Sequence, residues 1–180
     1  TEDIIGFDKL DGLLGSFYHP RSVAKNSDGF IFFGGVDGMT VFNPQSLVFN
    51  NEIPKVVITG FTLFNQPETT YGEDAILQKH ISETNRIELN YDQNTIGFVF
   101  VAINLINAEK NQFKYKLEGV DKEWINIGNK NDANYTQLQP GKYTFRVIAS
   151  NNDNVWNNEG ASIKIVIHPP WWGTNWFKAL

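Results

Sequence analysis

The sequence predicts an all-β chain, an immunoglobulin- or fibronectin-III-like β-sandwich preceded by a partial β-propeller blade. Aromatic residues make up 14% of the 180 residues, and 15 glycines and 7 prolines favour short strands and many turns over helices. The clearest strand follows the turn at Pro140-Gly141, where residue types alternate from Tyr143 to Ser150. About seven such strands, with turns every 8–12 residues or so, are typical of these sandwiches.

Tyr143 is the first residue of that strand and shares one face with Phe145, Val147 and Ala149. A tyrosine in this place can bury its ring and bond its hydroxyl to the upstream backbone, the device known as a tyrosine corner. An ordinary core aromatic is the alternative interpretation.

Residues 22–43 are expected to form a β-meander. Asp28-Gly29 and Asp37-Gly38 are turn signals between apolar runs, and Asn43-Pro44 ends the pattern. Blades of a propeller recur at roughly 40 to 50 residues, and this motif occurs once. A single blade cannot bury its own faces. We therefore expect residues 1–48 to be the remnant of the last blade of a larger propeller.

Residues 49–170 are expected to form the sandwich. Val56–Phe64 is predicted as one long strand with an irregularity at Gly60. Polar loops are expected over residues 65–74 and from Trp124 to Asn134. The other predicted strands are Arg86–Leu89, Thr95–Ala102, Phe113–Leu117, Tyr143–Ser150 and Ser162–Ile167, the last ended by Pro169-Pro170.

Composition excludes several functions. The formal net charge is −5 and no long basic run occurs, so no nucleic-acid partner is expected for this segment. The absence of cysteine excludes disulfides and thiolate metal sites. No apolar run approaches the roughly 20 residues that a membrane helix needs, so none is expected within the chain as given.

The titratable residues form no recognisable catalytic or metal-binding pattern. His19, His80 and His168 fall in different segments, so neither a metal site nor a cofactor is expected. A Gly-x-Ser-x-Gly nucleophile elbow does not occur. A glycosidase-like pair of Glu118 and Glu159 stays open, but nothing selects those two among 20 acidic residues. No catalytic residue is assigned.

Three of the five tryptophans, Trp171, Trp172 and Trp176, stand close together near residue 180. Tryptophan rings prefer the headgroup level of a bilayer, so residues 171–180 are predicted to be a membrane-proximal aromatic segment. Packing of these rings on the sandwich is the alternative, and the two can coexist.

The order of aromatic, glycine and acidic residues carries a family resemblance. The chain contains Tyr115-x-Leu117-Glu118-Gly119-x-Asp121-x-x-Trp124, then Tyr135-x-x-Leu138-x-Pro140-Gly141-x-Tyr143, then Asn151-x-x-x-x-Trp156. This order resembles the three-tyrosine (Y_Y_Y) domain, and the match extends from Ile53 to Trp176. The resemblance implies structural roles for the signature residues Tyr115, Gly119, Trp124, Tyr135, Pro140, Gly141, Tyr143, Asn151 and Trp156. The run from Gly34 to Pro44 resembles the repeat of the two-component-regulator propeller family.

The resemblance implies a function without catalysis. Domains of this kind lie between sensor propellers and the membrane in hybrid two-component regulators of Bacteroidetes. The expected function is signal relay and dimerisation, linking a propeller that binds oligosaccharide to the transmembrane helix of a hybrid histidine kinase and response regulator. The chain would then be a periplasmic segment of an inner-membrane protein, its partners a second copy, the upstream propellers and the adjacent membrane.

Two other functions stay open. A carbohydrate-binding module could use exposed aromatic rings as stacking platforms, with Trp124, Trp156 and Trp171 as candidates. Trp124 and Trp156, however, stand at positions where we expect a sandwich core to hold them. An accessory β-sandwich of a polysaccharide-degrading enzyme is the third hypothesis, and it predicts a catalytic domain upstream in the full-length gene.

Overall fold

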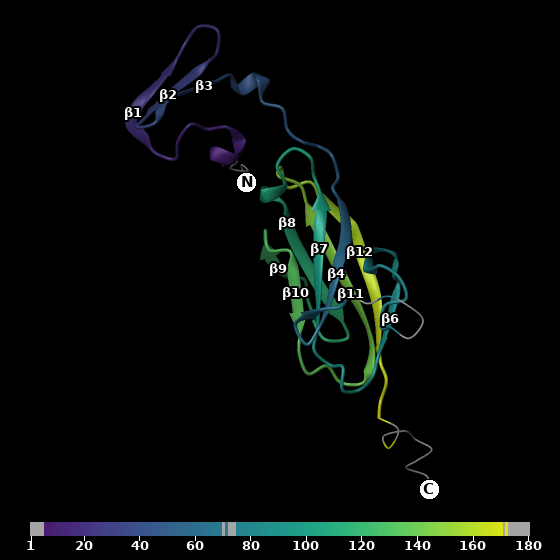
Figure 1. Ribbon diagram of the computed structural model, residues 1–180. Coiled ribbons are helices and arrows are strands. Elements are labelled where there is room, and N and C mark those ends of the chain that lie inside the picture. The colour runs from purple at the N-terminus through teal and green to yellow at the C-terminus, as the bar shows by residue number, and fades with distance from the viewer. Residues whose placement is uncertain (1–5, 70, 72–74, 171, 173–180) are drawn as a thin grey trace. The chain divides into compact units, whose positions relative to one another are not determined.

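The computed structural model describes residues 6–69, 71, 75–170 and 172. The chain forms two compact units, Thr1–Phe49 and Asn50–Leu180 (Figure 1). Strands dominate both units. The helical elements η1 (Lys9–Asp11), η2 (Pro44–Ser46), η3 (Ile81–Glu83) and η4 (Ala108–Lys110) are short, single 3-10 turns. The predicted all-β class is therefore confirmed.

The first unit holds an antiparallel three-stranded sheet in the order β1-β2-β3. Its strands are β1 (Tyr18–Lys25), β2 (Ile31–Gly35) and β3 (Gly38–Phe42). Val36 and Asp37 join β2 to β3, and Gly38 has a φ of 132°, a value that glycine adopts readily. The hairpin lies at the predicted place, with its two-residue loop one position earlier than Asp37-Gly38.

This small sheet leaves much apolar surface uncovered. The ring of Phe33 stacks on that of Phe42 at 6.0 Å and meets the edge of Tyr18 at 5.9 Å. A three-stranded sheet alone is too small to enclose the other apolar side chains. The exposed ones are Phe7, Leu10, Leu14, Phe17, Val23, Phe30, Val36, Met39, Val41, Leu47, Val48 and Phe49.

The second unit is a β-sandwich of two open sheets (Figure 1). The four-stranded sheet has the order β10-β7-β4-β5 and the five-stranded sheet the order β6-β12-β11-β8-β9. The strands are β4 (Lys55–Leu63), β5 (Gln66–Pro67), β6 (Arg86–Leu89), β7 (Ile96–Ile103), β8 (Gln112–Glu118), β9 (Ile125–Gly128), β10 (Asp132–Tyr135), β11 (Gly141–Ser150) and β12 (Trp156–Ile167). Neighbours pair antiparallel except β6 and β12, which are parallel.

Aromatic rings from facing strands form the centre of the core. Phe98 of β7 stacks on Phe145 of β11, with ring centroids 4.3 Å apart, and Phe100 packs against Phe113 of β8 at 5.3 Å. All four rings are at most 5% exposed. Because β7 belongs to one sheet and β8 and β11 to the other, these contacts hold the two sheets together.

The chain enters and leaves the sandwich at opposite ends. β4 begins opposite Ile103, the last residue of β7, and a hydrogen bond from Asn157 to the carbonyl of Pro54 places the start of β12 beside it. β12 ends with Ile167 opposite Gly141, the first residue of β11. We call these the upstream and downstream ends. The ten residues of β11 run between them, a length of about 30 Å.

The structure differs from the sequence prediction mainly at the sheet edges. The segments predicted as polar loops contain the short edge strands β5, β9 and β10. β12 starts at Trp156, six positions before the predicted Ser162. The irregularity predicted at Gly60 is confirmed, because the register of β4 against β7 shifts between Ile58 and Gly60. No helix among the described residues is long and apolar enough to cross a membrane.

Candidate functional site

Asn151 follows β11 directly and is almost fully buried. Its amide nitrogen donates to the main-chain carbonyls of Asn50, at 2.7 Å, and Glu52, at 2.8 Å. Its side-chain oxygen accepts from the main-chain N–H groups of Asp153, at 2.9 Å, and Val155, at 3.0 Å. Both amide hydrogens and the carbonyl oxygen are thus satisfied. Asn151 therefore fixes the incoming chain to the turn between β11 and β12.

Four further amide side chains extend this arrangement. Asn50 donates to the side-chain oxygens of Asn104, at 3.2 Å, and Asn152, at 3.0 Å. Asn104 donates in turn to Asn111, at 2.9 Å, and Asn152, at 3.0 Å. Asn111 closes the network by donating to the carbonyl of Ala102 at 2.9 Å. We call Asn50, Asn104, Asn111, Asn151 and Asn152 the asparagine clamp.

The asparagine clamp joins segments that are far apart in the sequence. It ties the chain ahead of β4 to the end of β7, the start of β8 and the β11–β12 turn. The main-chain N–H of Asn50 adds a bond of 2.6 Å to the carboxylate of Asp153. Buried networks in which each member finds partners hold one geometry, since rearrangement would leave polar groups unpaired. The segment ahead of β4 is thus held in one position at the upstream end of the sandwich.

The three signature tyrosines have distinct structural roles. Tyr135 ends β10, and its hydroxyl donates to the Asp121 carboxylate, which also accepts from the N–H of Leu117 at 2.7 Å. Tyr115 of β8 meets Tyr135 edge-to-face at 6.0 Å. Tyr143 donates to the carbonyl of Gln139 at 2.7 Å. Tyr115 and Tyr135 therefore bridge the two sheets, and Tyr143 forms the predicted tyrosine corner.

Burial and nearby carboxylates keep two of these hydroxyls protonated. Burial is the main cause that raises the pKa of Tyr135 well above its ordinary value of 10.0, and the hydrogen bond to Asp121 raises it further. The pKa of Tyr115 is also raised, by burial and then by the charges of Asp121 and Asp132. Both hydroxyls therefore stay protonated at neutral pH.

Two signature glycines lie against Tyr143. Gly119 has a φ of 102°, and a Cβ there would come within 3.0 Å of the Tyr143 ring. A Cβ on Gly141, which follows Pro140 in the turn, would lie 3.3 Å from the Tyr143 hydroxyl. The corner therefore requires small residues on both sides of the ring, which explains this part of the motif.

Trp124 and Trp156 lie on the outer face of the five-stranded sheet. This differs from the position in the sandwich core that we expected from their places in the motif. Nζ of Lys114 stands 4.2 Å from the Trp156 ring centroid, and the Arg146 guanidinium carbon 5.8 Å from that of Trp124. Trp156 pairs with Ser150, whose side chain points outward from β11, so its ring covers the outer face. Cations therefore already contact both rings.

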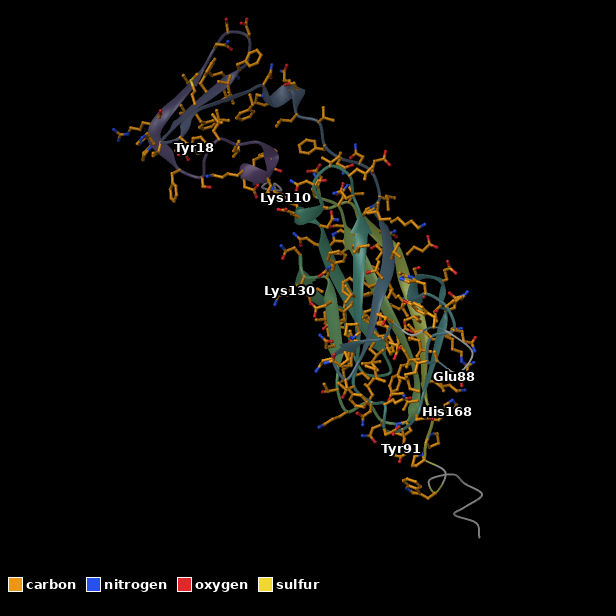
Figure 2. All side chains as sticks on the ribbon, viewed as in Figure 1. Tyr18, Glu88, Tyr91, Lys110, Lys130 and His168 are labelled. Carbon is orange, nitrogen blue, oxygen red and sulfur yellow. The ribbon has the colours of Figure 1, made fainter. Side chains whose placement is uncertain are left out.

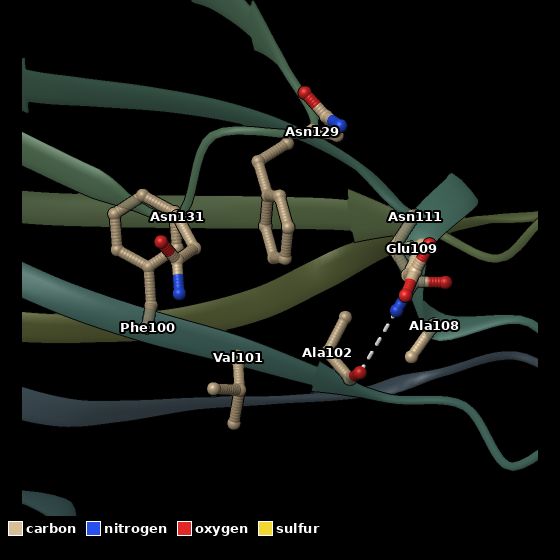
Figure 3. Close-up of a pocket in the computed structure, with 9 residues that line it drawn as sticks. Phe100, Val101, Ala102, Ala108, Glu109, Asn111, Asn129 and Asn131 are labelled. Carbon is tan, nitrogen blue, oxygen red and sulfur yellow. Dashed lines mark hydrogen bonds between the residues drawn. The ribbon is translucent and has the colours of Figure 1, made fainter.

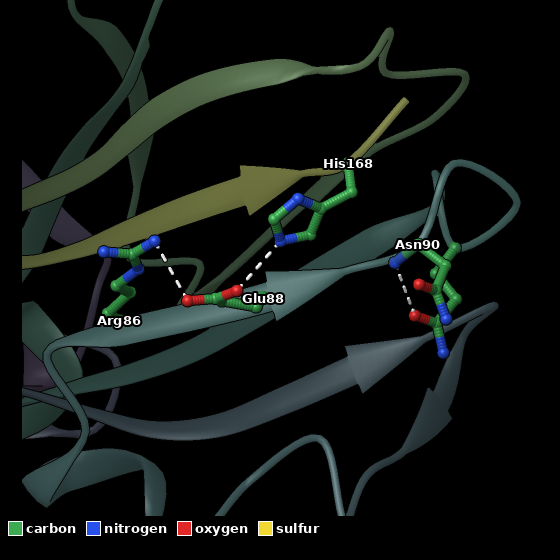
Figure 4. Close-up of polar contacts among 5 residues, drawn as sticks. Arg86, Glu88, Asn90 and His168 are labelled. Atoms are coloured by element: carbon green, nitrogen blue, oxygen red, sulfur yellow. Dashed lines mark hydrogen bonds and ion pairs between the residues drawn. The ribbon is translucent and has the colours of Figure 1, made fainter. Parts of the chain in front are cut away.

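At the downstream end, polar contacts join β6 to the end of β12 (Figure 4). Nε2 of His168 lies 2.8 Å from the carboxylate of Glu88, which also pairs with Arg86 at 2.9 Å. The hydrogen bond with His168 is the main cause that lowers the pKa of the Glu88 carboxyl, and Arg86 contributes. The N–H of His168 donates to the carbonyl of Leu89 at 2.8 Å. The outgoing chain is thus held on the sheet as far as residue 168.

The membrane-proximal tryptophans are described only in part. Trp171 and Trp176 lie outside the described residues. Trp172 is 46% exposed, and its ring meets Tyr91 edge-to-face at 5.3 Å. Tyr91, Glu88 and His168 lie at the same end of the sandwich (Figure 2). One of the three rings therefore contacts the sandwich, as the alternative interpretation of this segment allowed.

One cleft of the sandwich lies between β7 and the start of β8. This cleft of about 420 Å³ is lined by core rings and amide side chains, among them Phe100, Phe113 and Asn131, with Asn111 bonded to Ala102 at its edge (Figure 3). Glu118 pairs with Arg146 at 3.4 Å, an exposed contact on the outer face. Across the described ranges, no group of three or more histidine, aspartate or glutamate side chains is placed to hold a metal ion.

Comparison with known proteins gives a consistent result. The model of the Y_Y_Y domain matches residues 104–168. The chain is 35% identical over 176 residues to Histidine kinase P4 of Formosa agariphila, a match that covers 98% of this chain and 13% of that protein. The chain therefore spans a small part of the curated relative that it matches.

Solved structures show the same relationship. The extracellular domain of BT3049 from B. thetaiotaomicron, described as a hybrid two component system, is 26% identical with a TM-score of 0.72. That match covers 91% of this chain and 22% of the solved chain. The extracellular domain of BT4673, described in the same way, is 29% identical with a TM-score of 0.61, covering 83% of this chain and 20% of that one. Residues 104–168 thus match the Y_Y_Y domain, in a chain that is similar to the extracellular domains of hybrid two-component systems.

Proposed function

We propose that this chain is a non-catalytic relay module in the extracytoplasmic part of a two-component sensor. Its relatives are extracellular domains of such sensors and a histidine kinase, which supports a signalling role outside the cytoplasm. More specifically, we propose that the module lies in the periplasm and connects upstream propellers to a transmembrane helix of the inner membrane.

The observation that carries this proposal is the placement of the two chain connections. The incoming chain is held at the upstream end by the asparagine clamp, and the outgoing chain leaves β12 at the downstream end. One aromatic core fills the space between them. Close-packed interiors move as bodies and deform little, so a displacement imposed at one connection reaches the other.

The first unit fits the last blade of a propeller, and we assign residues 1–48 to it, residues 49–170 to the sandwich and residues 171–180 to the juxtamembrane segment. Its meander has the strand order of a blade. Its exposed apolar residues, such as Phe17, Val23 and Met39, are those that a neighbouring blade would cover. In this proposal the upstream propellers bind oligosaccharide and the sandwich transmits the response.

In this proposal the sensor is a symmetric dimer in the membrane, and the signal is a change in the separation of its two copies. The chain contains no cysteine, so an introduced one gives a clean signal for this segment. We expect Pro169→Cys in the full-length sensor to form a disulfide-linked dimer whose yield changes when the inducing oligosaccharide is added. The exposed Lys79→Cys serves as the control for random collision.

A strictly monomeric intact ectodomain in sedimentation, together with no cross-linked dimer in membranes, would contradict the relay proposal. The full-length gene separates it from the accessory-domain hypothesis. Relay predicts propeller repeats upstream and a kinase downstream, whereas an accessory domain predicts a catalytic domain upstream.

A further inference from the structure

The outer face of the five-stranded sheet carries an uneven distribution of charge. Outward positions on β6, β8, β11 and β12 hold Arg86, Lys114, Lys116, Lys142, Arg146 and Lys164, against the carboxylates Glu88 and Glu118. The chain as a whole has 15 basic and 20 acidic residues. This face is therefore strongly basic on a protein that is otherwise acidic.

The arginines of this face are paired, and its lysines are not. Arg86 binds Glu88 at 2.9 Å and Arg146 binds Glu118 at 3.4 Å, so these four charges largely cancel. Nζ of Lys116 donates to the carbonyl of Lys122 at 3.2 Å, which leaves its charge uncompensated.

No ion pair is found within the described part of the chain for Lys114, Lys116, Lys142 or Lys164. We call these four residues the lysine stripe.

The strand register places the lysine stripe in consecutive rows. Same-face positions along β11 are Lys142, Thr144, Arg146 and Ile148, spaced by about 6.6 Å. Lys164 lies opposite Thr144, Lys116 opposite Arg146 and Lys114 opposite Ile148. Each of the four rows thus contributes one unpaired ammonium group, along a length of about 20 Å.

Features at both ends of the lysine stripe suit a chain-like ligand. Lys142, Thr144 and Lys164 line a cleft of about 360 Å³ on the face. At the other end, Lys114 stands over the ring of Trp156. A row of ammonium groups beside aromatic rings fits a linear ligand that carries regularly spaced anions on flat, partly apolar rings.

We propose that the lysine stripe binds a linear acidic polysaccharide, whose carboxylate or sulfate groups lie on the lysines. A second copy of this chain does not fit, because a symmetric contact would bring lysines against lysines. The choice of a polysaccharide over a nucleic acid rests on the proposed extracytoplasmic location. The site is distinct from the oligosaccharide site that the relay proposal places in the propellers.

Titration calorimetry of the whole chain tests this directly, with polygalacturonate and a sulfated galactan as probes and a neutral glucan and a single-stranded oligonucleotide as comparisons. We expect binding of an acidic polysaccharide that weakens with added salt, and no binding of the glucan. The variant K114Q/K116Q/K142Q/K164Q should lose affinity by about tenfold or more. The matched variant K25Q/K55Q/K79Q/K130Q makes the same charge change elsewhere and should bind like the wild type.

The proposal is overturned if neither acidic polysaccharide binds, if the matched variant loses affinity equally, or if the oligonucleotide binds as tightly. Thermal unfolding of each variant shows whether it is folded. The quadruple Lys→Arg variant keeps the charges and should keep binding, so loss through misfolding can be recognised. Signalling by the full-length sensor is a separate readout. Absence of polysaccharide binding would therefore not contradict the relay proposal, and absence of signal relay would not contradict binding at the lysine stripe.

Discussion

The amide nitrogen of Asn151 donates to the main-chain carbonyl of Asn50 at 2.7 Å, between residues 101 positions apart in the sequence. This contact connects the chain ahead of β4 to the turn between β11 and β12. The motif Asn151-x-x-x-x-Trp156 therefore has two separate structural functions. Asn151 holds the incoming chain, and Trp156 covers the outer face beside Lys114.

Replacing Asn151 by alanine should destabilise the sandwich by about 2–4 kcal/mol, because buried carbonyl and N–H groups on both sides lose their partners. Chemical denaturation of the whole chain measures the change. The matched control is Asn158→Ala, an exposed residue in the bulge of β12, which should change the free energy of unfolding by less than about 0.5 kcal/mol. Equal effects at both positions would contradict a special role for Asn151.

Replacing Tyr135 by phenylalanine should change how stability depends on pH. Because the pKa of Tyr135 is raised in the folded state, its contribution is fully present below pH 10.0 and decreases as the pH rises above that value. Near neutral pH the variant should be less stable by about 1–2 kcal/mol, since the bond to Asp121 is lost. The difference should shrink above pH 10, as urea unfolding at several pH values can show.

The exposed Tyr91→Phe is the control for the Tyr135 variant. Its stability relative to the wild type is measured across the same pH series. A Tyr135→Phe difference that stays constant from neutral to alkaline pH would show that the hydroxyl is not held protonated by its surroundings.

Substitutions of Tyr143 should lower the stability of the sandwich. They should reduce signalling only as a consequence of that loss of stability. Tyr143→Phe loses the bond to the carbonyl of Gln139 and should cost about 1 kcal/mol. Tyr143→Ala also loses the ring and should cost a few kcal/mol, as aromatic truncations do. Thermal unfolding of the chain and a transcriptional reporter for the full-length sensor measure the two effects. A Tyr143 variant that is fully stable but does not signal would contradict this prediction.

Replacing Gly119 by alanine should destabilise the fold by about 1–3 kcal/mol, because the backbone has a φ of 102° and the new Cβ would come within 3.0 Å of the Tyr143 ring. Gly128→Ala separates these two causes. Gly128 also has a positive φ, of 63°, but its added Cβ would have no neighbour within 4 Å. The Gly128 variant should lose about 1 kcal/mol, from the backbone alone. An equal loss at both positions would mean that contact with Tyr143 is unimportant.

Strands with a strict alternation of residue types were predictable from the sequence. β8 and β11 follow the period of two, and their inward residues Phe113, Leu117 and Phe145 are buried as that period requires. β9 and β10 were missed because they are short and lie at sheet edges, where asparagine and aspartate can face solvent. Such residues are equally typical of loops, so local sequence does not distinguish the two.

The asparagine clamp shows a different limit of sequence analysis. Asn151 was identified through the motif, but Asn50, Asn104 and Asn111 were not, because asparagines in polar segments usually indicate turns. Their significance depends on which segments the fold brings together. Trp124 and Trp156 show the same limit, since their motif positions gave no indication of the sheet face on which they lie.

The opposite positions of the two chain connections also determine how the sandwich would respond to a pulling force. Tension between the start of β4 and the end of β12 acts along the strands, so the ladder bonds of β12 with β11 and β6 are loaded in shear, many at once. Peeling, in which bonds break one after another, would need both connections at the same end. The module is therefore built as a stiff mechanical link, which should hold its length under loads that would unzip a hairpin.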